Sequence, residues 1–83
     1  MKNKKIEFSL HAGDKLRRLV KIGVTKNVVL KIIREPEKVV DGYYGRKIAQ
    51  GSLSKDLILR IVYKENEEIM VVTVYPGERR RYE

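Results

Sequence analysis

The stretch IMVVTVYP (Ile69–Pro76) decides the fold, because its eight residues are mostly β-branched or apolar and predict a buried β-strand. Pro76 and Gly77 form a turn signal, and we expect the strand to end there. RRRY (79–82) follows, so three guanidinium groups and a phenol leave the edge of the predicted sheet. Guanidinium groups match phosphate geometry with two parallel hydrogen bonds, and a tyrosine ring offers a face for base stacking. These residues favour nucleic-acid binding; a solvated charged tail is the alternative.

Further strands are predicted upstream of this stretch. Residues 57–63 alternate in the manner of a strand, and Arg60 is the isolated charge within that otherwise apolar run. Residues 64–68 are polar and form a hairpin loop before Ile69. Two more strand-like stretches, residues 38–44 and 46–51, come earlier in the chain.

Two helices are predicted ahead of these strands. Ser9 and Thr25 are candidate N-caps, because each hydroxyl can accept a hydrogen bond from the first helical turn. Gly23 stands where a left-handed C-terminal glycine belongs, and Pro36 limits the second helix to about Arg34. The first helix is amphipathic, with a basic outer face formed by Lys15, Arg17, Arg18 and Lys21.

The order of these elements predicts a single α+β domain over residues 1–83. We expect two N-terminal helices packed on a three- to four-stranded twisted antiparallel sheet, with residues 5–8 as a short strand or extended lead-in. The helices would cover one face of the sheet, which leaves the other face available for function.

The charge balance favours a polyanion as partner. The 19 Lys and Arg residues outnumber the 11 Asp and Glu residues and give a net charge of +8. Residues 1–42 hold 11 of the basic residues against five acidic ones, so the surplus lies in the N-terminal half. Such a surplus steers a protein toward nucleic acid more readily than toward other partners.

Other classes of function are disfavoured by what the chain contains. It has no cysteine and one histidine, so a thiolate or zinc site is not expected, and neither is any other metal or cofactor. The longest uncharged, mostly apolar run, residues 69–75, is far shorter than the ~18 residues of a membrane span. We therefore expect a cytoplasmic protein with no membrane contact.

The order and spacing of several motifs resemble a known group. They resemble a small, poorly characterised family of the RelE/ParE toxin superfamily, and the ending is similar to the close of the related BrnT toxins. The resemblance covers residues 6 to 83, essentially the whole chain. The motifs are FSLHA (8–12), the helix 16–23, REPE (34–37), GRK (45–47), LRIVY (59–63), VVTVYP (71–76) and RRRYE (79–83).

This resemblance implies a RelE-like fold and kinship with messenger-RNA endonucleases of type II toxin–antitoxin systems. Such toxins act on the ribosome or on free RNA and are silenced by a cognate acidic antitoxin. They cut RNA without metal, using Lys and Arg side chains on the open sheet face and a Tyr or His near the C-terminus. No convincing C-terminal catalytic His or acid is present here. The positions that match as candidates are Arg46, Lys47 and Arg60 on strands, and Tyr75, Arg79, Arg80, Arg81 and Tyr82 near the end.

For cleavage, the candidate catalytic residues are His11, Arg60 and Tyr75. His11 or Tyr75 would move protons, and Arg60 would stabilise charge on the phosphorane. The structural alternatives are that His11 hydrogen-bonds locally and fastens the first helix, and that Arg60 pairs with Asp41 or Glu7 across the sheet. Aromatic residues are also normal in strands.

Two other classes of function stay open. One is a non-catalytic RNA- or DNA-binding module, which the net charge favours and which needs no proton-transfer residues. The other is a protein-interaction domain that assembles through an exposed strand edge. Tyr43 and Tyr44 could stack on bases if the protein binds nucleic acid, whether or not it cleaves it. The sequence does not decide between a monomer and a dimer.

Overall fold

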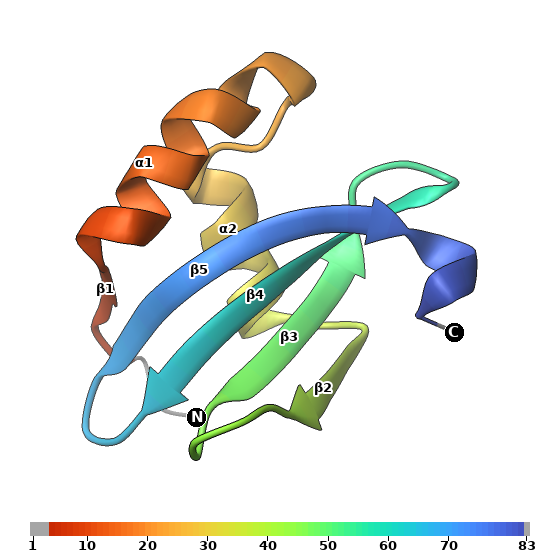
Figure 1. The fold of residues 1–83 in the computed structure, drawn as a ribbon. Helices are drawn as coiled ribbons and strands as arrows, with labels where there is room; N and C mark the ends of the chain where they lie inside the picture. Colours follow the sequence, from red (N-terminus) through yellow and green to blue (C-terminus); the bar gives the residue numbers. More distant parts are fainter. Residues whose placement is uncertain (1–3, 83) are drawn as a thin grey trace.

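The computed structural model describes residues 4–82 and has two helices against a five-stranded sheet (Figure 1). The strand order across the sheet is β1-β5-β4-β3-β2. The elements are β1 (Ile6–Phe8), α1 (Leu10–Leu19), the 3₁₀ turn η1 (Val20–Ile22), α2 (Lys26–Arg34), β2 (Lys38–Asp41), β3 (Lys47–Ser52), β4 (Leu57–Glu65), β5 (Ile69–Glu78) and the 3₁₀ turn η2 (Arg79–Arg81).

The α+β class and the antiparallel meander from β2 to β5 are confirmed, but the strand count and the purely antiparallel sheet were wrong. β1 joins as a fifth strand and runs parallel to β5, with Ile6 opposite Ile69. Its three residues are too few to show a periodicity, and its partner lies at the far end of the chain. The sheet is therefore mixed.

The predicted helix signals are confirmed. The Ser9 hydroxyl accepts a hydrogen bond from the amide of Ala12 (3.0 Å) and donates one to the carbonyl of Val72 (2.9 Å). It therefore caps α1 and ties the start of that helix to β5. Thr25 caps α2, which ends at Arg34 as expected. Gly23 adopts a left-handed φ of 87° after η1, the conformation that favours glycine.

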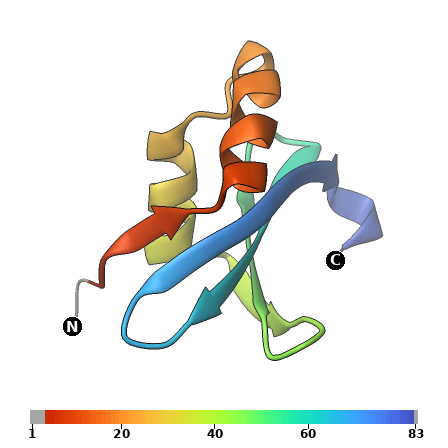
Figure 2. The same cartoon turned by 60° about the vertical axis from the view of Figure 1, so that its left-hand side comes forward.

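Both helices lie on one side of the sheet, where the core forms (Figures 1 and 2). α1 packs against β5, and α2 packs against β3. At Gly51 an added Cβ would lie 2.6 Å from Cγ1 of Ile32, so the absence of a side chain allows α2 to approach β3 closely. The fully buried residues of the cluster that the helices and the sheet share are Ala12, Val24, Val29, Ala49, Leu59, Ile61, Val71 and Val74. No helix in residues 4–82 is long and apolar enough to cross a membrane.

The expected end of the last strand at Pro76 and Gly77 was wrong, because β5 continues through both residues to Glu78. β1 pairs only with residues 69–71 of β5, so the later part of β5 has β4 on one side alone. A proline is tolerated at such an edge, where its missing N–H can face solvent. The extra length carries the last turn, η2, over the sheet face that the helices leave open.

Candidate nucleic-acid interface

A row of three polar side chains crosses the open face of the sheet. The strand register places Gln50 of β3 opposite Arg60 of β4, and Arg60 opposite Tyr75 of β5. Arg60 alternates with Leu59 and Ile61, which are buried under the helices, so its side chain projects from the other face. Directly opposed side chains on one face are neighbours, so the register brings the three groups together.

Arg60 is held in place by neutral groups. Its Nε donates a hydrogen bond to the hydroxyl oxygen of Tyr75 (3.0 Å), and its Nη1 donates one to Oε1 of Gln50 (3.2 Å). Its guanidinium carbon lies 4.1 Å from the centre of the Tyr82 ring, which stacks on it as a cation–π contact. Within residues 4–82, no carboxylate oxygen comes within 4.0 Å of this guanidinium. The structure therefore does not contain the ion pair of Arg60 with Asp41 or Glu7 that was the structural alternative for this residue.

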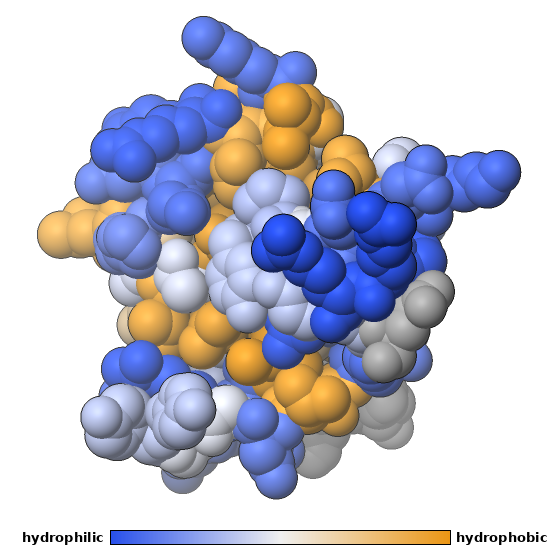
Figure 3. Space-filling view, turned by 45° about the vertical axis from the view of Figure 1, so that its right-hand side comes forward, coloured by the Kyte–Doolittle hydropathy of each residue, from blue (hydrophilic) through white to orange (hydrophobic). Residues whose placement is uncertain are grey.

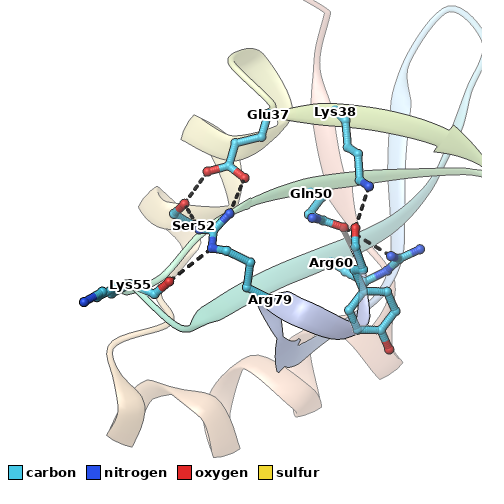
Figure 4. A network of polar contacts seen from close by, with 8 residues as sticks. Glu37, Lys38, Gln50, Ser52, Lys55, Arg60 and Arg79 are labelled. Carbon is cyan, nitrogen blue, oxygen red and sulfur yellow. Dashed lines mark hydrogen bonds and ion pairs between the residues drawn. The ribbon is translucent and has the colours of Figure 1, made fainter.

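The C-terminal turn folds back over this row and is fastened to β2. The amine of Lys38 donates a hydrogen bond to the backbone carbonyl of Tyr82 (2.5 Å). Figure 4 shows this contact beside the hydrogen bond between Arg60 and Gln50. Gly77 lies directly beneath the ring of Tyr82, because an added Cβ there would be 2.6 Å from Cε2 of that ring. Tyr82 is thus a packed residue of the open face and not a loose tail.

Arg79 makes a second, separate network, also drawn in Figure 4. Its Nη1 donates to Oε1 of Glu37 (3.1 Å), its Nε donates to the carbonyl of Lys55 (3.1 Å), and its Nη2 donates to the hydroxyl of Ser52. Ser52 in turn donates to the other carboxylate oxygen of Glu37. These hydrogen bonds, first from Ser52 and then from Arg79, lower the pKa of the Glu37 carboxyl. Arg79 was a predicted phosphate ligand, but its guanidinium is engaged with the protein and anchors η2.

Arg80 and Arg81, unlike Arg79, are mostly exposed to solvent. Their side chains are 86% and 74% exposed, and their only carboxylate partner in the described residues is Glu78, at 3.9 and 3.7 Å. Contacts this long and exposed contribute little to stability. Both guanidinium groups therefore remain available to a ligand. In the space-filling view of this side, strongly hydrophilic side chains gather beside paler ones (Figure 3).

The remaining predicted site residues lie elsewhere. His11 is exposed on α1, on the helix-covered side, so the sheet separates it from Arg60. Arg46 lies in the turn between β2 and β3, and Lys47 is the first residue of β3, at the opposite end of that strand from Ser52. Lys47 is 4.0 Å from a carboxylate oxygen of Glu65. The structure thus brings Arg60, Tyr75 and Tyr82 together and leaves the other predicted residues apart.

Sequence reasoning missed Lys38 and Gln50 as members of the site. Gln50 is the one buried polar residue of the described chain; it is 5% exposed and lies beside Arg60. A glutamine in a short apolar strand was the available signal, because a buried amide needs a partner. Which partner it meets depends on the register of β3 against β4, and a single sequence does not give that register.

The described residues contain no group of three His, Cys, Asp or Glu side chains that could hold a metal ion. Comparisons with protein-family models, with curated proteins and with solved structures found no match to this chain. The case for function therefore depends on the site itself.

Proposed function

We propose that this protein binds single-stranded RNA on the open face of its sheet, with Arg60 as the phosphate anchor. The observation that carries the proposal is the environment of Arg60: the guanidinium is fixed in position, yet all its partners within residues 4–82 are neutral. A fixed positive charge without a carboxylate is suited to an anion from outside the protein.

Donor geometry supports this role. A guanidinium group has five N–H donors, and the contacts of Arg60 to Tyr75 and Gln50 use two of them. Tyr82 stacks on the flat face of the group and leaves the donors at its rim free. The free donors can bind two phosphate oxygens side by side, which is the strongest arrangement for this pair.

The surroundings favour a flexible, single-stranded ligand. Lys38, which holds Tyr82, and the exposed Arg80 and Arg81, which precede Tyr82 in the chain, add positive charge, and Tyr75 and Tyr82 supply aromatic rings. Cations that follow a backbone, together with rings on which bases stack, are how proteins bind single strands without a fixed sequence. The resemblance to the RelE/ParE superfamily favours RNA over DNA.

Metal-independent RNA cleavage is a second candidate function, favoured by the hydrogen bond between Arg60 and Tyr75. Because the Tyr75 oxygen accepts from Arg60, its own hydrogen is free for another acceptor. In this mechanism the 2′-oxygen attacks phosphorus and its proton passes to water. The P–O5′ bond breaks, Tyr75 protonates the leaving 5′-oxygen, and Arg60 neutralises the phosphorane. His11 takes no part, since the sheet lies between. A toxin of this kind would have an acidic antitoxin as its partner.

The binding proposal is tested with fluorescently labelled single-stranded RNA and the variant Arg60→Gln. Arg34→Gln is the matched control, because Arg34 is exposed on α2 and has no ion pair within residues 4–82. Both variants lose one charge, but we expect Arg60→Gln to weaken binding about 10- to 100-fold through its lost charged hydrogen bonds. Wild-type affinity should also fall steeply with salt. Equal losses in the two variants would contradict Arg60 as the anchor.

Cleavage is tested separately by incubating RNA with wild-type protein and with Tyr75→Phe, with and without ribosomes. Phenylalanine keeps the ring and removes the proton donor, so products should form with the wild type and be reduced in the variant. If the wild type binds RNA and leaves it intact under both conditions, the endonuclease candidate is wrong and the binding proposal stands.

A further inference from the structure

The turn between β2 and β3 carries two tyrosine side chains that contact little of the protein. Tyr43 and Tyr44 are 86% and 88% exposed, although Tyr is a residue that usually buries much of its ring. Their ring centres are 6.4 Å apart and their planes are inclined by 52°. Each ring therefore presents a face to solvent at the tip of a hairpin.

The backbone of this turn is tightly defined. The amide of Gly42 donates to the carbonyl of Arg46 (2.8 Å), and the amide of Arg46 donates to the carbonyl of Tyr43 (3.2 Å). Tyr44 has a φ of 59°, and Gly45 has a φ of 73°. A left-handed conformation is unusual for an aromatic residue, and glycine or asparagine would form the same turn with less strain. Strain of this kind collects at functional sites.

Positive charge without a partner adjoins the two rings. The guanidinium of Arg46 makes no ion pair and donates no side-chain hydrogen bond in the described part of the chain, and its Nε is buried without an acceptor. Lys47 follows directly and has only a long contact to Glu65. Exposed rings beside a cation that has no carboxylate partner in the described residues are a combination that single-stranded nucleic acid satisfies through stacking and phosphate contacts.

We propose that this hairpin tip is a second nucleic-acid subsite, in which Tyr43 and Tyr44 stack on unpaired bases and Arg46 binds a neighbouring phosphate. This inference rests on the proposed RNA-binding function and extends it to a second position along the same bound RNA. It gives a role to Arg46 and Lys47, which the Arg60 site does not use.

The distance between the two subsites sets the length of RNA that can fill both. β3 runs from Lys47, beside the tip, past Gln50, which lies opposite Arg60, to the other end of the sheet (Figure 1). The three residue steps from Lys47 to Gln50 span about 10 Å. A dinucleotide has a single phosphate and can therefore fill only one of the two phosphate positions, whereas a strand of about 12 nucleotides lies within the range of known single-strand sites and can reach both.

The test compares a dinucleotide with an RNA of about 12 nucleotides on four proteins: wild type, Tyr44→Gly, Tyr43→Ala and the double variant Tyr43→Phe/Tyr44→Phe. Tyr44→Gly is suited to the backbone because Gly tolerates the positive φ, so it removes the ring without unfolding the turn. We expect each ring removal to weaken binding of the longer RNA about tenfold. Binding of the dinucleotide at the Arg60 site should be unchanged, and the phenylalanine variant, which keeps both rings, should bind as the wild type does.

The outcomes separate this inference from the function on which it rests. If the wild type binds neither RNA, the proposed function itself is wrong. If Arg60→Gln weakens binding but Tyr44→Gly and Tyr43→Ala bind the longer RNA as tightly as the wild type, the second subsite is wrong and the first remains. If those variants keep RNA affinity but lose self-association in light scattering, the tip is a protein contact, which also overturns the inference.

Discussion

The substitution Gly77→Ala should displace Tyr82 from Arg60 although neither of those two residues is itself replaced. A Cβ on Gly77 would lie 2.6 Å from Cε2 of the Tyr82 ring, whereas carbon atoms in contact lie about 3.5–4.0 Å apart. The ring must therefore move by about 1 Å, away from its 4.1 Å contact with the Arg60 guanidinium. The backbone at Gly77 does not require glycine, because its φ is not positive.

The size of the effect follows from two opposing contributions. Crowding and loss of the stack should cost about 1–3 kcal/mol of the free energy of unfolding. Alanine also restricts the unfolded chain, which contributes about 0.4–1 kcal/mol in the stabilising direction. We therefore expect a net loss of about 1 kcal/mol in the wild type. In a Tyr82→Ala background the clash is absent, and the same substitution should be neutral or slightly stabilising.

Urea unfolding of the wild type, both single variants and the double variant measures this coupling. The expected coupling of about 1–2 kcal/mol exceeds the ~0.5 kcal/mol scatter of independent sites. RNA affinity should fall in both single variants, because Arg60 loses the ring that holds its plane. If Gly77→Ala changes stability equally with and without the Tyr82 ring, the packing of the C-terminal turn over Arg60 is refuted.

Two further predictions concern the fold that supports the site. Gly51→Ala should lower the free energy of unfolding in urea by about 1–3 kcal/mol, because its Cβ would lie 2.6 and 2.9 Å from Cγ1 and Cγ2 of buried Ile32. An unchanged urea midpoint would contradict that contact. Hydrogen bonds from Ser52 and Arg79 lower the pKa of Glu37 from its ordinary value of 4.5, so their stabilisation is present above that value and is lost as pH falls through the lowered pKa. Glu37→Gln should therefore flatten the fall in melting temperature below about pH 5, and wild-type and variant curves that stay parallel would show that Glu37 does not contribute.

The parts of the fold that could be predicted from the sequence are those with local signals. Ser9, Gly23 and Thr25 marked the helix boundaries because a cap depends on residues three or four positions away. Residues 5–8 were expected to be a short strand or an extended lead-in, but local signals could not place β1 in the sheet, since its pairing with β5 joins residues more than 60 positions apart. The continuation of β5 through Pro76 depends equally on non-local structure, because it requires β1 to end before reaching that part of the sheet.

The candidate site likewise has features that local sequence patterns predict and features that depend on non-local structure. Alternation within β4 was enough to isolate Arg60 as the charge on the open face. Its contacts with Gln50 and Tyr75 depend on the registers of two strand pairs, which no local pattern specifies. The direction of the C-terminal turn could not be predicted either. The sequence showed three arginines in a row, but it did not show that one anchors the turn while two remain exposed.

The contrast between Arg60 and Arg79 is the strongest physical basis for a binding function. Both are partly buried arginines fixed by hydrogen bonds, but Arg79 meets the carboxylate of Glu37, which neutralises it within the protein. For stability alone an apolar residue would suit position 60, between Leu59 and Ile61 in β4, at least as well as a guanidinium held by neutral groups. A carboxylate in place of Gln50 would compensate the charge better, but it would also remove the attraction that a phosphate needs. Gln50, Tyr75 and Tyr82 instead hold the guanidinium in one orientation, and no carboxylate of the described residues pairs with its charge, which suits a preformed phosphate site.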